Sequence, residues 1–185
     1  MKMLQNTPKN EKTEAPRTQA ERTALAESRM VSAAIDLLYT AGIQGTTLVA
    51  IGERSGYSRG LATHHFGSKA ALFRTVLRRI TAVWTEELMR NISGKTGLEA
   101  FRIATDTHLG HVLSHPDYIR ATNILWGAAL DPSSEFKPNV AEFMRIQRAS
   151  VAGWVRGGQD NGEIRPDLNP DRIGEHGVEH VLGGA

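Results

Sequence analysis

Capping residues and glycines alternate in the stretch 46–69, and this alternation limits what the chain can fold into. It predicts two short helices, one from Leu48 to about Arg54 and one that Ser58 caps, running to about His65. Each has a hydroxyl side chain that can cap its start and a glycine that can end it: Thr47 and Gly56 for the first, Ser58 and Gly67 for the second. Two short helices separated by three or four residues have the layout of a helix-turn-helix.

Gly52, Gly56 and Tyr57 meet the packing demands of this layout. The two helices cross closely, so a small residue is needed where the first meets the second, and Gly52 is small. The turn needs a residue that tolerates positive φ, which Gly56 does, and Tyr57 can then enter the core. The remaining internal contacts are expected from three apolar residues, Ile51, Leu61 and Ala62. The pattern is moderately specific, because a generic pair of antiparallel helices can also produce it.

The rest of the chain also repeats its apolar residues at helical spacing, and it has no alternating strand pattern of useful length. Proline and glycine mark the breaks, the Gly157-Gly158 pair among them. The other expected helices are Arg22–Ala41, which Gly42 can end, Lys69–Asn91, Leu98–Ser114, Asp117–Leu130, Glu135–Arg156 and a last segment from Pro170. We therefore expect an all-α fold, preceded by a disordered arm over the polar residues 1–20.

Charge is distributed unevenly along the chain. Residues 17–79 hold nine Lys and Arg against four Asp and Glu, a net charge of +5, whereas residues 80–185 hold ten against fourteen, a net charge of −4. A basic first third suggests a polyanionic partner for that part alone. The chain has no cysteine, no apolar run as long as a membrane span and no apolar signal segment at its start. We expect a cytoplasmic protein with no membrane partner.

The second short helix is expected to enter a DNA major groove, where the residues near its start would meet base edges. Arg59 has the geometry for a bidentate contact to guanine, and Gly60 leaves space for close approach. Thr63 and His64 can meet a thymine methyl group or a phosphate. Helix N-termini favour phosphate, so residues at the starts of the flanking helices are also candidates for contacts to the DNA backbone. The predicted DNA-contacting residues are Thr47, Ser58, Arg59, Gly60, Thr63, His64 and Lys69.

The stretch 56–72 resembles the signature of the tetracycline-repressor (TetR) family of regulators. The matching residues are Gly56, Ser58, Gly60, His65, Phe66, Ser68, Lys69 and Leu72, with Gly42, Thr47 and Ile51 upstream. The resemblance covers residues 22 to about 77. The chain departs from the family in two respects: Thr63 and His64 stand where aromatic residues are usual, and Gly52 stands where alanine is usual. Glycine at position 52 costs up to about 1 kcal/mol of helix propensity.

The resemblance implies a DNA-binding domain of three helices over residues 21–79 and a helical effector-binding and dimerisation domain over residues 80–185. It further implies a homodimer that binds double-stranded, pseudo-palindromic operator DNA. The implied protein is a repressor that an unknown small molecule releases from this DNA. The helix Lys69–Asn91 joins both domains and is expected to move as a lever. The segment 171–185 is short for a last family helix and holds four glycines. An apolar stripe on Glu135–Arg156 would therefore have to carry more of the dimer contact.

Aromatic and polar side chains in the second domain are candidates for an effector pocket, although an ordinary helical core would hold similar residues. The candidates are Trp84, Phe101, His108, His111, Asn123, Trp126, Phe143 and Gln147. His108, His111 and His115 can share a helix face. A metal site usually needs ligands from more than one element, so we expect no metal and no cofactor.

Three other functions are alternatives to a regulator. An enzyme is disfavoured, because the chain has no nucleophile elbow, phosphate loop or zinc-binding helix motif. An architectural DNA binder would be basic throughout, unlike residues 80–185. A DNA-binding or protein-interaction module without ligand response is the remaining alternative. The sequence leaves open the effector, the operator and the choice between repression and activation.

Overall fold

The computed structural model describes residues 18–181, which form eight helices and no strand. The expectation of an all-α fold is confirmed. The helices are α1 (Gln19–Gly45), α2 (Leu48–Ser55), α3 (Arg59–Phe66), α4 (Lys69–Ile92), α5 (Gly97–Ser114), α6 (Pro116–Ala129), α7 (Lys137–Asp160) and α8 (Pro170–Val181). Within the described range, no helix is both long enough and apolar enough to cross a membrane.

Helix α1 begins before the predicted start at Arg22. Thr18 and Glu21 form a capping box, in which the Glu21 backbone N–H donates to Thr18 Oγ1 at 3.2 Å and the Thr18 N–H donates to Glu21 Oε2 at 2.7 Å. Residues 18–20 therefore start the helix and do not belong to the predicted arm, whose residues 1–17 lie outside the described part. Gly42 interrupts α1 at φ 66°, at the predicted end of the helix, before the chain reaches Gly45.

Helix α7 passes through Gly157-Gly158, where the sequence predicted a break. A Cβ atom on Gly157 would overlap Thr96 Oγ1, and one on Gly158 would lie 3.0 Å from the Cα of Gly97. The two glycines therefore allow the end of α7 to cross the start of α5 with the backbones in contact. The helix keeps its hydrogen bonds while it gains this close packing, which outweighs the low helix propensity of glycine.

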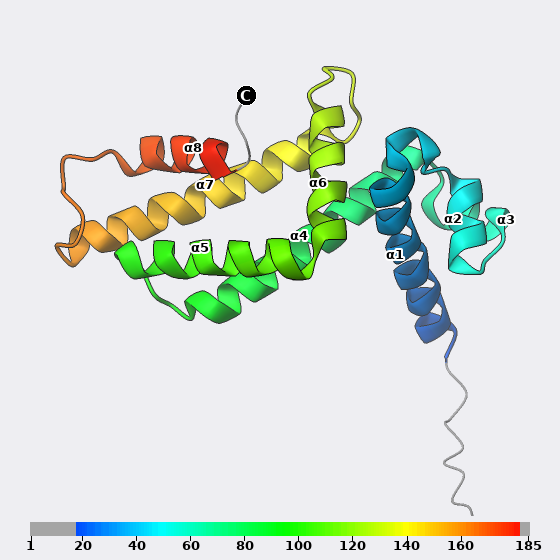
Figure 1. Ribbon diagram of the computed structural model, residues 1–185, viewed down its shortest axis with the longest axis horizontal. Helices are drawn as coiled ribbons and strands as arrows, with labels where there is room; N and C mark the ends of the chain where they lie inside the picture. The colour runs from blue at the N-terminus through cyan, green and yellow to red at the C-terminus, as the bar shows by residue number, and fades with distance from the viewer. Residues whose placement is uncertain (1–17, 182–185) are drawn as a thin grey trace, which may run out of the picture.

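The molecule has two ends that α4 connects (Figure 1). Helices α1, α2 and α3 gather around the first part of α4, helices α5 and α7 lie along its second part, and α8 packs on α7. Helix α6 stands across the others between the two ends, and it packs along α1.

A continuous hydrophobic core joins α6 to the first four helices. Fully buried side chains of this core include Met30, Leu38, Ile51 and Leu72, and the same cluster contains Leu125 of α6. Phe136, which follows α6, packs edge to face on Phe73 of α4 at a centroid distance of 6.0 Å. The core thus crosses the domain boundary that the sequence predicted between residues 79 and 80.

Candidate DNA-contacting surface and ligand cavity

Helices α2 and α3 cross at Gly52 with almost no space between them. A Cβ atom at this position would lie 2.9 Å from the Arg59 nitrogen and 3.1 Å from the Tyr57 carbonyl oxygen. Gly56 ends α2 in the left-handed region at φ 77°, and the Tyr57 N–H donates to the Gly52 carbonyl at 2.8 Å. The glycine that departs from the family pattern therefore permits a closer crossing than alanine would allow.

The buried face of α3 is narrower than the sequence predicted. Ala62 and Phe66 lie one turn apart and are buried, Ile51 of α2 is fully buried, and Tyr57 packs against the same core. Leu61, expected to make internal contacts, has 37% of its surface exposed. It stands about 100° around the helix from Ala62, and α3 contacts the rest of the domain on one side only.

The opposite face of α3 presents four of the predicted DNA-contacting residues to solvent. Arg59, Gly60, Thr63 and His64 are all exposed. Within the described residues, neither Arg59 nor His64 has a hydrogen-bonding partner, so both side chains have their donors available. The spacing of these residues places them on one side of two helical turns, which is the shape of surface that enters a major groove.

Hydroxyl caps fix the starts of α2, α3 and α4, as predicted. Thr47 Oγ1 accepts from the Ala50 N–H and Ser58 Oγ from the Leu61 N–H, both at 3.1 Å. Thr47 and Ser58 are exposed, and each hydroxyl that caps as an acceptor keeps its own O–H donor. Both residues can therefore hold a helix start and still donate to a phosphate oxygen.

Lys69 has a partner that the sequence did not indicate. Its Nζ donates to the Ile43 carbonyl oxygen at 2.5 Å and lies 5.5 Å from the centroid of the Phe73 ring. Partial burial lowers the pKa of the Lys69 ammonium. The side chain fastens the start of α4 to the end of α1. Its remaining N–H donors are available for the phosphate contact predicted from the sequence.

Two further side-chain pairs hold the helix-turn-helix on α1. His65 Nε2 of α3 lies 3.1 Å from Glu27 Oε2, and Arg54 Nε of α2 donates to Asp36 Oδ2 at 2.6 Å. These contacts fix the angle at which α3 leaves the domain surface. His65 is half-buried in this pair with its ring edge to face on Phe66, so it belongs to the support of α3 and not to its exposed face.

A cavity of about 380 Å³ lies between α4, α5, α6 and α7. Seven of the eight candidate pocket residues line it: Trp84, Phe101, His108, His111, Trp126, Phe143 and Gln147. Several other lining residues were not predicted from the sequence, including Thr81, Thr105, Thr122 and Asn139. Each of these four residues lies three or four positions from a candidate on its own helix, so helical spacing was the signal that could have found it.

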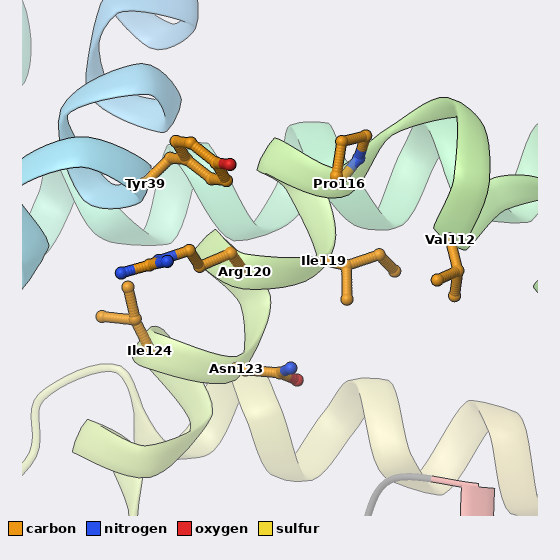
Figure 2. A pocket seen from close by; sticks show the side chains of 7 residues that line it. All are labelled: Tyr39, Val112, Pro116, Ile119, Arg120, Asn123 and Ile124. Atoms are coloured by element: carbon orange, nitrogen blue, oxygen red, sulfur yellow. The ribbon is translucent and has the colours of Figure 1, made fainter.

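Asn123 lies outside this cavity, contrary to the expectation. One side of α6 faces the cavity through Thr122 and Trp126, and Asn123 lies about 100° around the helix from Thr122. It lines an open pocket between α1 and α6 (Figure 2). There Arg120 reaches from α6 toward α1, with its guanidinium carbon 5.2 Å from the centroid of the Tyr39 ring.

The cavity contains two histidines in different environments. His111 is buried, and its Nδ1 lies 2.8 Å from Glu87 Oε2 of α4. His108 is half-buried, and burial together with the nearby His111 lowers the pKa of its imidazole. Trp84 packs against both rings, at centroid distances of 5.6 Å to His108 and 5.5 Å to His111. His108 is therefore held in its neutral form near pH 7.

The three histidines of α5 and its end do not combine into a metal site. The rings of His111 and His115 contact each other at a centroid distance of 4.8 Å, tilted by 48°. In the described part of the chain, no three His, Cys, Asp or Glu side chains are arranged to hold a metal ion.

Five residues of the apolar stripe on α7 line the cavity: Val140, Phe143, Gln147, Val151 and Trp154. The expectation that this stripe would carry more of the dimer contact stays a prediction. Helix α7 has to cover the cavity that α4, α5 and α6 leave open, and its apolar side chains are used there.

Comparison with known proteins identifies the first part of the chain most clearly. Residues 30–76 match the profile of bacterial regulatory proteins of the tetR family. The chain is 30% identical over 132 residues to the HTH-type transcriptional regulator RutR of Escherichia coli, a match that covers 70% of this chain and 62% of RutR. It is 25% identical over 72 residues to the HTH-type transcriptional regulator BetI of Burkholderia cenocepacia, 38% of this chain and 37% of BetI. The matched part thus spans less than two thirds of either relative.

Solved structures share the fold over most of the chain. A putative TetR-family regulator from Rhodococcus sp. superimposes with a TM-score of 0.69 at 19% identity, covering 86% of each chain. FadR of Bacillus subtilis, solved with stearoyl-CoA, gives a TM-score of 0.71 at 14% identity and covers 84% of each chain. SmeT, solved with triclosan, gives a TM-score of 0.67 at 20% identity and covers 86% of this chain and 79% of SmeT. The likeness therefore extends from the helix-turn-helix through the helices around the cavity.

Proposed function

Because the chain belongs to the TetR family of bacterial regulatory proteins, we propose that it is a DNA-binding transcriptional regulator, a repressor that a small molecule releases from its operator. The observation that carries the proposal is the exposed face of α3, with Arg59 and His64 unpaired among the described residues and the helix held rigidly against α2 at Gly52. The proposal assigns the protein no catalytic role and places it in the cytoplasm with the chromosome.

The operator contact is proposed to need two copies of the chain. A two-fold dimer would place two α3 helices in successive major grooves, about 34 Å apart, on a pseudo-palindromic site. In each copy Arg59 would read a guanine, and Thr63 and His64 would contact a thymine methyl group or the backbone. Thr47, Ser58, Gly60 and Lys69 would bring the backbone amides, hydroxyls and one ammonium close to the phosphates.

The cavity between α4 and α7 is proposed to be the effector site. FadR and SmeT, which share the fold, were solved with stearoyl-CoA and with triclosan, and this supports ligand binding by the same kind of domain. Helix α6 could couple the binding of such a ligand to the DNA-binding helices, because it contacts both the cavity and α1. Thr122 and Trp126 line the cavity, Leu125 on the same helix lies in the core shared with α1, and Ile119 lines both the cavity and the pocket beside Tyr39.

A ligand that displaces α6 would therefore displace α1, and with it the spacing of the two α3 helices. The lever proposed for α4 acts in parallel, since Leu77, Ile80 and Trp84 of α4 line the same cavity. The ligand acts only through its preference for the conformation in which the spacing does not fit DNA.

A fluorescence-anisotropy titration tests the proposal. The probes are duplex DNA from immediately upstream of the gene and a scrambled duplex of the same length, each at two salt concentrations. Tight binding to the upstream duplex alone, with two chains per duplex, is the expected result. Equal and strongly salt-dependent binding to both duplexes would indicate a non-specific DNA binder instead, and no binding to either would favour a protein-interaction module.

A further inference from the structure

The cavity wall is built largely from aromatic rings of four helices. Phe101 meets Trp154 edge to face at a centroid distance of 5.6 Å, and Trp126 lies 5.7 Å from Phe143. Trp84 completes the set, so all three tryptophans of the chain line this one cavity. Flat rings of this kind pack best against another flat, apolar ring system.

The size of the cavity sets the size of that ring system. A dry protein cavity of about 150 Å³ is known to hold benzene. A cavity of about 380 Å³ therefore has room for about two rings of that size.

Charge decides between a neutral and an ionic ligand. Among the described residues that line the cavity, none is Lys, Arg, Asp or Glu. The carboxylate of Glu87, which contacts the lining residue His111, is already paired with it at 2.8 Å. An anion would lose its hydration without meeting a cation. A cation would meet only ring faces, whose attraction is smaller than the cost of removing a charge from water.

Four polar side chains of the cavity wall, Thr81, His108, Asn139 and Gln147, have no hydrogen-bonding partner within the described residues. Of these, His108 projects from α5 and Gln147 from α7. Both can donate and accept, because His108 is held neutral and Gln147 carries an amide. Two of the threonines nearby are already used: Thr105 donates to the Phe101 carbonyl and Thr122 to the Tyr118 carbonyl of their own helices.

From these features we infer that the effector is an uncharged molecule of about two aromatic rings, with a hydroxyl or carbonyl group that hydrogen-bonds to His108 and Gln147. This inference rests on the proposed function, because it names the chemical class of the ligand that the regulator senses.

Four probes on one scaffold separate ring packing, hydrogen bonding and charge: biphenyl, 4-phenylphenol, biphenyl-4-carboxylate and 4-phenyl-N,N,N-trimethylanilinium. Binding to the full chain is measured by isothermal titration calorimetry at pH 7.5. The indole N–H signals in a ¹H–¹⁵N spectrum locate each probe, because all three tryptophans line the cavity. Operator binding is measured by anisotropy on the same samples.

We expect 4-phenylphenol to bind about tenfold more tightly than biphenyl, both ions to bind more weakly than either, and the indole signals to shift. Tighter binding of the carboxylate or of the ammonium would overturn the inference, and so would the absence of binding by all four probes. If operator binding is intact in that last case, the regulator proposal stands and the ligand class is wrong. If the probes bind in the expected order but no duplex is bound specifically, the cavity preference stands and the regulator proposal is wrong.

Variants isolate the hydrogen bonds from the packing. His108→Phe and Gln147→Leu keep the volume and remove the polar groups, so each should abolish most of the tenfold preference for 4-phenylphenol while biphenyl still binds. Retained binding of biphenyl shows that the variant is folded. Asn123→Leu is the matched control, because Asn123 is on α6 outside the cavity, and it should keep the full preference. A preference that survives in both cavity variants would contradict the assignment of His108 and Gln147.

Discussion

Replacing Gly52 with alanine tests whether the crossing of α2 and α3 is as tight as the structure indicates. The new Cβ atom would lie 2.9 Å from the Arg59 nitrogen and 3.0 Å from the Ser58 carbonyl carbon. Both are backbone atoms, which cannot rotate away as the end of a side chain can. Restoring a normal van der Waals contact requires α3 to move by roughly 0.5 Å relative to α2.

Two opposing terms set the size of the effect. Alanine gains up to about 1 kcal/mol of helix propensity over glycine, whereas overpacking a close contact typically costs about 1–3 kcal/mol. With the full helix-propensity gain offset against the overpacking cost, the G52A variant should therefore lose up to about 2 kcal/mol of unfolding free energy. Because Arg59 is the first residue of α3, the same movement displaces the side chain expected to read the operator, so operator affinity should fall as well.

Urea unfolding followed by circular dichroism measures the stability, and anisotropy measures the operator affinity. Gly110→Ala is the matched control, since Gly110 is an exposed position inside α5 where an added Cβ atom would meet nothing within 4 Å beyond its own helix backbone and chain neighbours. This control should gain about 0.5–1 kcal/mol. If G52A gains stability as G110A does, the crossing is not tight and the structural reason for glycine at position 52 is wrong.

Three further predictions concern the recognition helix, the cavity and the link between them. Arg59→Ala should weaken specific operator binding by about 1–3 kcal/mol in anisotropy titrations, and unchanged affinity would refute the assigned face of α3. Arg120→Ala removes the contact with the Tyr39 ring, so the effector should release DNA less effectively while binding with unchanged affinity; equal release by both proteins would argue against a route through α6. Burial and the nearby His111 lower the pKa of His108 in the folded state below its ordinary value of 6.5. As the pH falls, His108 is therefore protonated in the unfolded state before it is protonated in the folded state, and the free energy of unfolding decreases on acidification. His108→Phe should lose less stability than the wild type between pH 7.5 and 5.5, and equal losses in urea unfolding would contradict this role.

Local signals predicted the helices and the helix-turn-helix well. The caps Thr47, Ser58 and Ser68 and the turn at Gly56 are found as expected, because each depends on atoms within about four residues along the chain. The earlier start of α1 was also readable from the Thr18 and Glu21 pair, another local pattern.

The cavity was predicted in composition but not in detail. Aromatic and polar side chains on apolar helix faces marked seven of its lining positions, since the inner faces of packed helices have to meet. The position of Asn123 was wrong because a sequence does not fix how far a helix is rotated about its axis, and about 100° separates it from Thr122. That rotation depends on α6 packing against α1, which is a contact between residues far apart in the chain.

Local sequence patterns were enough to predict that this chain forms helices, where most of them begin and end, and which short helix presents Arg59 and His64. Three features depend on packing between distant segments. Gly157 and Gly158 stay helical, Lys69 fastens α4 to the end of α1, and α6 belongs both to the cavity wall and to the core of the DNA-binding helices. Caps and helical periodicity depend on neighbouring residues, whereas these features depend on which helix faces meet. That choice is made when the whole chain buries its apolar surface at once.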